Sequence, residues 1–176
     1  EMTLHIQNRR NEYGPIINPQ AAVVTVNMLK YVLRKGGTAE HVGQGYRLSF
    51  PVAGKTGTST NWNDAWFAGY TADSASAVWI GNSKGSISLG RHRSGGALSA
   101  PVWGRYIAQA YPDAKPGDFQ LPDADLTAVT ICLDSGKLVK DSNFCPHIAV
   151  DELFVSGTEP TDYCDIHTGF TETPVD

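Results

Sequence analysis

The spacing of apolar residues predicts a helix over residues 19–35. Asn18 is a suitable N-cap, Pro19 fits the first turn, and the glycine pair at 36–37 ends the pattern. The apolar stripe of this helix consists of Ala21, Ala22, Leu29, Val32 and Leu33. Thr38 follows directly and is expected to cap a second, short helix in T-A-E-H-V.

The hydrophobic period changes after this region. Three segments rich in β-branched and aromatic residues follow, at 51–60, 64–71 and 76–82, and the polar breaks N-W-N and A-D-S separate them. Such closely spaced segments predict adjacent antiparallel strands. A second apolar helix is predicted over 97–111, with Pro101 in its first turn. Helices packed against an antiparallel sheet define the predicted fold class, α+β.

Residues 113–125 are rich in proline and aspartate and predict a linker. It divides the chain into a main part, 1–112, and a small C-terminal extension, 126–176, which contains all the cysteines. In the extension, T-A-V-T-I-C-L and L-V flank the turn D-S-G-K and predict a hairpin, and the residues after it are expected to be irregular. Weak alternation over residues 3–8 predicts one more strand.

Composition argues against several classes of protein. Hydrophobic residues make up 41%, as in ordinary soluble domains, and no apolar run approaches the roughly 18 residues that span a bilayer. The net charge is −4 and the basic residues do not cluster, which argues against nucleic acid as a partner. The chain begins at Glu1 without a leader-like segment, so we expect it to be part of a longer protein.

Residues 51–60, P-V-A-G-K-T-G-T-S-T, are open to two chemical interpretations. A phosphate-binding loop requires G-x-x-x-x-G-K-[ST] at the start of a helix. Here the first glycine is replaced by Ser49 and the residues after Thr56 are strand-like, so spacing and context both fail. The G-x-S-x-G run at 81–85 also lacks the helix that a serine elbow requires after Ser83, and it predicts a polar turn.

The other interpretation is an active-site strand with the sequence Lys55-Thr56-Gly57-Thr58. A fixed ammonium at Lys55 attracts an anionic substrate and assists proton transfer. Gly57 lets a substrate lie against the strand, and the hydroxyls of Thr56 and Thr58 share a face on which a carboxylate can bind. A backbone N–H there can also stabilise an oxyanion. The alternative is an ordinary edge strand with a solvated lysine.

The surrounding sequence favours the active-site strand. The run A-G-K-T-G-T-S-T-N-W-N-D-A-W-F-A-G-Y-T-A-D-S-A-S-A-V-W-I-G-N, followed by G-G-A-L-S-A-P-V-W-G-R-Y-I-A-Q-A-Y, resembles the C-terminal half of the transpeptidase domain of class A (bifunctional) penicillin-binding proteins. Four features occur in the same order as in that family: K-T-G-T, a strand that begins with Asp and contains aromatic residues, a third strand, and a helix preceded by Gly-Gly. The resemblance covers about residues 13–112.

The resemblance implies the serine β-lactamase/transpeptidase-like fold and a parent enzyme that cross-links peptidoglycan. In this family a serine attacks the D-Ala-D-Ala bond of a stem peptide, an amine accepts the acyl group, and β-lactams acylate the same serine. By this resemblance Lys55, Thr56, Gly57 and Thr58 would be the catalytic residues of this chain. The Thr56 and Thr58 hydroxyls would bind the substrate carboxylate, and the N–H of Thr58 would be one oxyanion donor. No cofactor is implied.

The resemblance also places the parent at the extracytoplasmic face of the bacterial cell membrane, with a membrane anchor and a glycosyltransferase domain that this chain lacks. The chain departs from the family pattern because no serine in it begins S-x-x-K, and Ser59-Thr60-Asn61 follows K-T-G-T instead of preceding it. We therefore expect one wall of an active site, inactive alone and completed by the missing N-terminal part of the protein. The alternatives are a non-catalytic β-lactam or peptidoglycan sensor on the same fold, and a binding module in which the extension is the active part.

The odd number of cysteines leaves several arrangements open: one disulfide plus a thiol, three thiols, or a metal site. Because the resemblance implies an oxidising compartment, a disulfide between Cys145 and Cys164 is the expected arrangement. The alternative is a zinc site of the Cys3His type, although the spacing matches no standard zinc module. Its ligands would be Cys132, Cys145, Cys164 and His167.

The remaining histidines and the large aromatic residues suggest no chemistry of their own. No partner in the sequence accompanies His5, His41 or His92, and we expect all three at the surface. Packing in a core or cleft is expected of Trp66, Phe67, Trp79 and Trp103.

Overall fold

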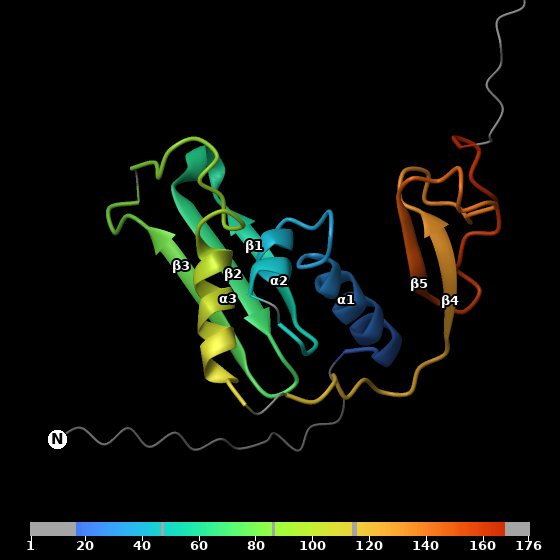
Figure 1. Cartoon of the computed structure of the whole chain (residues 1–176), viewed down its shortest axis with the longest axis horizontal. Helices are drawn as coiled ribbons and strands as arrows, with labels where there is room; N and C mark the ends of the chain where they lie inside the picture. Colours follow the sequence, from blue (N-terminus) through green and yellow to red (C-terminus); the bar gives the residue numbers. More distant parts are fainter. Residues whose placement is uncertain (1–16, 47, 86, 114–115, 168–176) are drawn as a thin grey trace, which may run out of the picture.

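The structure is a computed structural model that describes residues 17–46, 48–85, 87–113 and 116–167. A three-stranded sheet with helices packed beside it forms the main part, and a separate two-stranded sheet lies beyond the first helix (Figure 1). The strand expected at residues 3–8 lies outside the described residues. Within them, no helix combines the length and apolar character needed to cross a bilayer.

The first helix begins where the sequence predicts. Helix α1 spans Pro19–Tyr31, and the Asn18 side chain accepts hydrogen bonds from the N–H groups of Gln20 (2.9 Å) and Ala21 (3.3 Å). This confirms Asn18 as the N-cap. The helix ends at Tyr31, earlier than expected, and the chain then turns through Gly36, whose φ is +84°.

The second helix, α2, spans Glu40–Gly45, and Ala39 rather than Thr38 is its N-cap. No side chain caps it, so the prediction that Thr38 caps this helix is wrong. The Thr38 hydroxyl instead lies 3.0 Å from the hydroxyl of Thr56. The Thr38 hydroxyl, which the local sequence predicts as the cap of α2, is therefore used in a tertiary contact with β1.

The predicted strands form the three-stranded sheet. Strands β1 (Ala53–Thr58), β2 (Asp64–Tyr70) and β3 (Ala75–Gly81) are antiparallel in the order β1-β2-β3, which confirms the predicted pairing. Helix α3, Ser99–Ala110, contacts β2 and β3, with Pro101 in its first turn as expected. The observed fold is therefore α+β.

Helix α3, with α2 packed beside it, covers one face of this sheet. In β2, Ala65 and Phe67 are buried and Trp66 between them is exposed, as strand alternation requires. The ring centroids of Phe67 and Trp103 lie 5.0 Å apart, which joins α3 to the sheet. The core at this face consists of Leu33, Ala39, Val42, Phe67, Ala100, Trp103 and Ile107. A Cβ at Gly69 would lie 2.4 Å from the Trp103 ring, so a glycine is needed there.

The opposite face carries two partly exposed indoles. Trp66 and Trp79 have ring centroids 6.1 Å apart, and their exposed fractions are 47% and 44%. The Trp79 Nε1–H donates to Asp64 Oδ1 at 2.9 Å, which fixes its ring over the sheet. Of the aromatic residues expected in a core or cleft, Phe67 and Trp103 are buried in the core, whereas Trp66 and Trp79 are exposed.

After α3 the chain has no helix or strand over residues 116–125 and runs to the extension (Figure 1). Strand β4, Leu126–Cys132, forms as predicted, and the D-S-G-K turn follows it, with a bridge between Ile131 and Leu138. The main partner of β4, however, is β5, Ile148–Val155. The prediction of irregular structure after the turn is therefore wrong for these residues.

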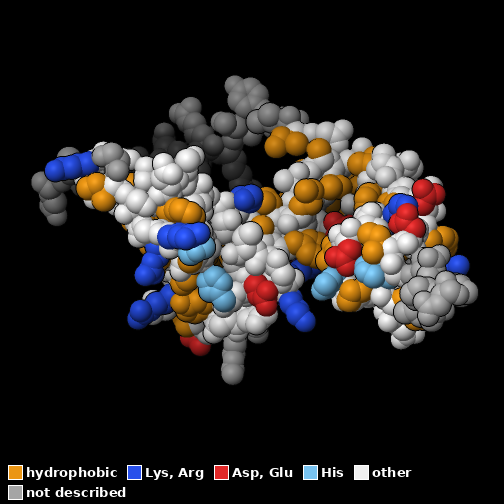
Figure 2. Space-filling model, turned by 90° about the horizontal axis from the view of Figure 1, so that it is seen from above, with side chains coloured by type: hydrophobic (Ala, Val, Ile, Leu, Met, Phe, Trp, Pro, Cys, Tyr) orange, Lys and Arg blue, Asp and Glu red, His pale blue; other side chains and the backbone are white. Residues whose placement is uncertain are grey.

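Helix α1 and the two-stranded sheet meet through polar contacts. Asn27 Nδ2 donates to Glu152 Oε1 at 3.3 Å, and Gln20 Nε2 donates to the carbonyl oxygen of Asp125 at 3.1 Å. A cavity of about 680 Å³ separates α1 from β4 and β5. In the face that Figure 2 shows, most of the acidic side chains lie on the extension and most of the basic side chains on the main part. The extension thus rests on α1 without sharing the main core.

Truncating Trp103 should destabilise the main part. Trp103→Ala removes a fully buried indole and its contact with Phe67, and we expect a loss of roughly 3–5 kcal/mol in the free energy of unfolding. Val102→Ala, at an exposed position of the same helix, is the matched control and should change stability by less than about 0.5 kcal/mol. Urea unfolding followed by circular dichroism measures both, and equal midpoints would contradict the proposed core.

Candidate functional site

The K-T-G-T sequence lies on β1, which is an edge strand of its sheet. The N–H of Ser59 donates to the carbonyl oxygen of Asp64 at 3.0 Å, and bonding alternates along an antiparallel pair. With the observed register, Lys55 and Gly57 bond to β2, and the N–H and C=O groups of Thr56 and Thr58 point away from it. The strand therefore offers an open edge along which an extended ligand can pair.

The side chains of β1 divide between the two faces. Thr56 and Thr58 lie opposite Phe67 and Ala65, on the face that α3 covers, so the expectation that the two hydroxyls share a face is confirmed. Lys55 is exposed on the other face, and its Nζ donates to the carbonyl oxygen of Thr56 at 2.8 Å. This hydrogen bond brings the ammonium to the open edge of the strand.

Two contacts orient the threonine hydroxyls. Thr58 Oγ1 accepts a hydrogen bond from the N–H of Gly95 at 3.0 Å, and Thr56 Oγ1 lies 3.0 Å from Thr38 Oγ1. A hydroxyl that accepts a hydrogen bond keeps its own proton for donation. The Thr58 O–H is therefore held in place and remains available to an anion.

The Gly95–Gly96 pair allows this arrangement. A Cβ at Gly95 would lie 2.1 Å from the carbonyl oxygen of Trp66 and 2.5 Å from that of Gly57, and a Cβ at Gly96 would lie 2.2 Å from the carbonyl oxygen of Thr38. Only glycine lets the loop before α3 approach the sheet so closely. Sequence reasoning noted the Gly-Gly pair as a family feature but did not place it, or Thr38, beside K-T-G-T.

The rejected serine motifs occupy turns. Ser59 Oγ accepts from the N–H of Asp64 at 2.8 Å, and Asn61, with φ of +60°, helps form the β1–β2 turn. Ser83 lies in the turn after β3, where the N–H of Lys84 donates to Asn82 Oδ1 at 2.9 Å. Among the described residues, no helix follows Ser83 directly, so the serine-elbow interpretation fails. Lys55 lies on strand β1 rather than at the start of a helix, so the phosphate-loop interpretation fails too.

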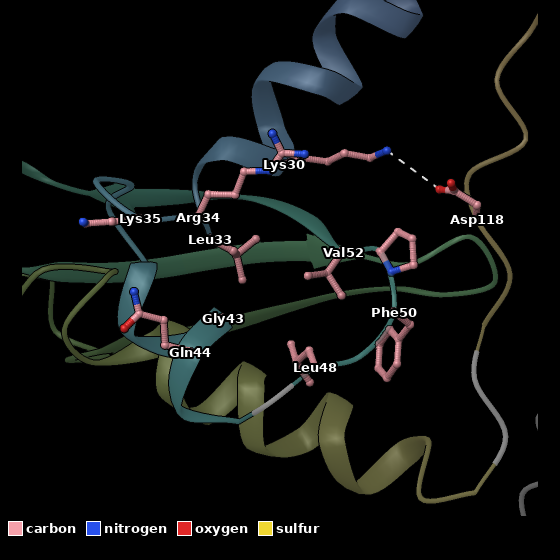
Figure 3. Close-up of a pocket in the computed structure, with 11 residues that line it drawn as sticks. Lys30, Leu33, Arg34, Lys35, Gly43, Gln44, Leu48, Phe50, Val52 and Asp118 are labelled. Carbon is pink, nitrogen blue, oxygen red and sulfur yellow. Dashed lines mark ion pairs between the residues drawn. The ribbon is translucent and has the colours of Figure 1, made fainter. Parts of the chain in front are cut away.

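A cavity of about 570 Å³ lies near the C-terminal end of α1, away from K-T-G-T (Figure 3). Lys30, Arg34 and Lys35 border it together with Val52 and other residues of the segment before β1. The ammonium of Lys30 is 3.8 Å from Asp118 Oδ1, so one of these cations already has a partner. His41 and His92 are exposed elsewhere, as expected, and His5 lies outside the described residues.

The extension brings its cysteines together. Cys132, Cys145 and Cys164 are buried, and their sulfur atoms and a ring nitrogen of His167 all lie within 4.8 Å of one another. The expectation that Cys145 and Cys164 are close is confirmed. All three thiols are free, however, so the structure does not contain the expected disulfide between Cys145 and Cys164. The three sulfur atoms share one site with the histidine instead.

Local hydrogen bonds shift the pKa values of the thiols in opposite directions. The Ser135 hydroxyl and the backbone N–H groups of His167 and Ile166 outweigh burial and lower the pKa of Cys164 to about 6. For Cys132, burial raises the pKa but hydrogen bonds from Ser135 and Asp134 outweigh it, so the pKa is lowered. Burial and the neighbouring thiols raise the pKa of Cys145 to about 12. The pKa is thus lowered at two of the three sulfur positions and raised at the third.

Comparison with known proteins finds relatives of both parts of the chain. The family model described as "Penicillin-binding protein 1A, C-terminal domain" matches residues 122–169. Penicillin-binding protein 1A of Clostridium perfringens is 32% identical over 162 residues, which are 89% of this chain and 18% of that protein. The protein of the same name from Aquifex aeolicus is 34% identical over 144 residues, 80% of this chain and 18% of that protein.

A crystal structure of penicillin-binding protein 1A from Haemophilus influenzae matches with a TM-score of 0.68 and 26% identity, covering 87% of this chain and 23% of that one. The resemblance to the C-terminal part of class A penicillin-binding proteins is confirmed. The predicted α+β, transpeptidase-like fold is confirmed with it. The chain spans about a fifth of the length of the curated relatives it matches. Sequence reasoning did not recognise that the extension belongs to the same resemblance.

A methyl group at Gly95 should disturb the site. In Gly95→Ala the new Cβ meets the carbonyl oxygens of Trp66 and Gly57, which must push the loop away from Thr58. We expect a loss of about 1–3 kcal/mol in the free energy of unfolding and a shifted Thr58 amide resonance. Gly45→Ala, where a Cβ meets nothing within 4 Å, is the control. Unchanged urea midpoint and amide spectrum in Gly95→Ala would refute the close approach.

Proposed function

We propose that this chain supplies the K-T-G-T wall of a penicillin-binding D,D-transpeptidase that cross-links peptidoglycan. The observation that carries the proposal is the open edge of β1, where the Lys55 ammonium bonds to the carbonyl oxygen of Thr56 and the Thr58 hydroxyl is held by Gly95. The names of the matched relatives support penicillin as a ligand of such proteins. Residues 126–167 form the extension, which follows this part of the active site in the chain.

We assign to the groups along β1 the roles that the family resemblance implies. A stem peptide lying along the open edge pairs with the backbone groups of Thr56 and Thr58. The Thr58 hydroxyl, held by Gly95, donates to the terminal carboxylate of D-Ala-D-Ala, and the Thr56 hydroxyl does so after turning from Thr38. The N–H of Thr58 donates to the oxyanion that forms when the peptide carbonyl is attacked. The charge of Lys55 favours the anionic substrate and assists proton transfer.

The reaction requires a nucleophile that these 176 residues do not supply. In the proposed acyl transfer, a serine oxygen attacks the penultimate D-Ala carbonyl, the terminal D-Ala leaves with a proton, and an amine of a second stem peptide displaces the serine. No serine here begins S-x-x-K, so we place the serine and its base in another segment of the parent protein. We also place the parent at the extracytoplasmic face of the membrane, fused to a glycosyltransferase.

The exposed tryptophans of the sheet support completion by further residues. Trp66 and Trp79 leave nearly half of their surface exposed on the face opposite α3. Large adjoining apolar side chains of this kind are typical of contact surfaces. The remainder of the same protein is the partner that we propose for this face.

In the parent protein, Lys55→Ala and Thr58→Val should each lower the rate of β-lactam acylation by at least ~100-fold without unfolding the domain. Each change removes one oriented charge or donor from a preorganised site, which typically has this effect. Lys84→Ala, an exposed lysine in the turn after β3, is the control. Stopped-flow labelling with a fluorescent penicillin gives the second-order rate constants. Rates near that of the wild type in both site variants would remove these residues from the mechanism.

The isolated 176-residue chain should form no covalent adduct with penicillin, whereas the parent should be labelled on a serine outside this chain. Gel fluorescence and intact mass at saturating fluorescent penicillin measure both. A one-to-one adduct on the isolated chain, abolished by mutating one of its own serines, would show that the nucleophile is misplaced. An unlabelled but penicillin-binding parent would favour the non-catalytic sensor instead.

A further inference from the structure

The extension has an unusual core. Among its described residues, the buried apolar side chains are those of Cys132, Cys145, Ala149 and Cys164, and Val139 packs against the cysteines. A unit of about 40 residues buries too little apolar surface to be stable by itself and usually depends on a disulfide or a metal. The three thiols are free. A further interaction between these side chains is therefore needed to stabilise the extension.

We propose that Cys132, Cys145, Cys164 and His167 bind one structural zinc ion in tetrahedral geometry. The Nδ1 atom of His167 lies 3.4 Å from the sulfur of Cys132 and 3.5 Å from that of Cys164. Ordinary zinc–sulfur and zinc–nitrogen bond lengths place such ligand atoms about 3.6 Å apart. All the ligand atoms lie within 4.8 Å of one another, so small rotations of side chains bring them onto one ion.

The histidine is oriented as zinc-bound histidines are. While Nδ1 of His167 faces the sulfur atoms, its Nε2 lies 3.6 Å from Asp134 Oδ2. A carboxylate near the far ring nitrogen favours the tautomer that leaves the near nitrogen free to bind metal. Asp134 also lies 3.2 Å from Nδ1 of His147, an exposed histidine that is not one of the four ligands.

The backbone forms a tight turn directly after one of the ligands, Cys132. After Cys132 the chain turns tightly, with the N–H of Gly136 donating to the carbonyl oxygen of Cys132 at 2.8 Å and φ of +70° at Gly136. This turn places the Cys132 thiol and the Asp134 carboxylate in one short loop beside His167.

Further contacts hold the ligand-bearing loops together. The N–H of Cys164 donates to the carbonyl oxygen of Leu138 at 2.8 Å, and the ammonium of Lys137 pairs with Asp165 at 2.7 Å. These contacts fix the C-x-x-H segment at 164–167 beside the turn that carries Cys132. Cys145 then supplies the fourth ligand from the loop before β5.

The disulfide alternative accounts for less of this arrangement. A bond between any two of the cysteines leaves a buried third thiol beside an imidazole whose Nδ1 faces sulfur. Three sulfur atoms and one ring nitrogen around a single point match the preferred ligand set of structural zinc. The proposal also gives the unusual core a function, because metal binding adds directly to folding free energy.

Metal analysis of the 176-residue chain tests the proposal. Purified without added metal and under reducing conditions, the chain should contain one zinc ion per molecule by plasma mass spectrometry. Cys164→Ser should reduce the content at least ten-fold, and His147→Asn, which changes an exposed histidine beside the same Asp134, should leave it at one. Loss of zinc in His147→Asn, or its retention in Cys164→Ser, would overturn the proposed ligand set.

A second measurement guards against a variant that merely unfolds. Replacing zinc by cobalt in the unmodified chain should produce the intense visible and near-ultraviolet bands of tetrahedral, thiolate-ligated cobalt. Absence of these bands together with three freely titrating thiols would overturn the proposal. So would an intact mass showing one disulfide in a folded, metal-free chain.

Discussion

The position of the K-T-G-T strand depends on the packing of Trp103 against Phe67. That contact fixes α3 on β2, and the buried Ser99 hydroxyl then donates to the carbonyl oxygen of Ala65 at 2.7 Å. With the start of α3 fixed, the preceding loop places the Gly95 N–H on the Thr58 hydroxyl. A polar site at the strand edge is thus oriented by an aromatic contact in the core.

The sequence indicated most of this arrangement because its signals were local. Strand alternation, the polar breaks and the Asn18-Pro19 start predicted the sheet and the first helix in their observed places. Strand β5 was missed because Asp151 and Glu152 interrupt its apolar pattern, and Asp151 has φ of +55°, where the strand is irregular. The partners of Thr38 and the convergence of the cysteines depend on contacts distant in sequence, which no local pattern reveals.

The two parts of the chain are stabilised by different physical means. Apolar burial stabilises the main part, so its stability changes little with the redox state or metal content of the solution. The extension is centred on sulfur and imidazole, whose interactions depend on protonation, oxidation and available metal. Between them lie polar contacts and a cavity rather than a common core, so either part can respond to conditions without unfolding the other.

The open edge of β1 has a consequence beyond substrate binding. An edge strand that can accept an extended peptide can equally accept a strand from another molecule, and such edge-to-edge pairing is a common start of aggregation. Lys55 counters this tendency, since a charged side chain on an exposed edge disfavours the approach of a second identical edge. The same ammonium that suits an anionic peptide therefore also helps keep the sheet from polymerising.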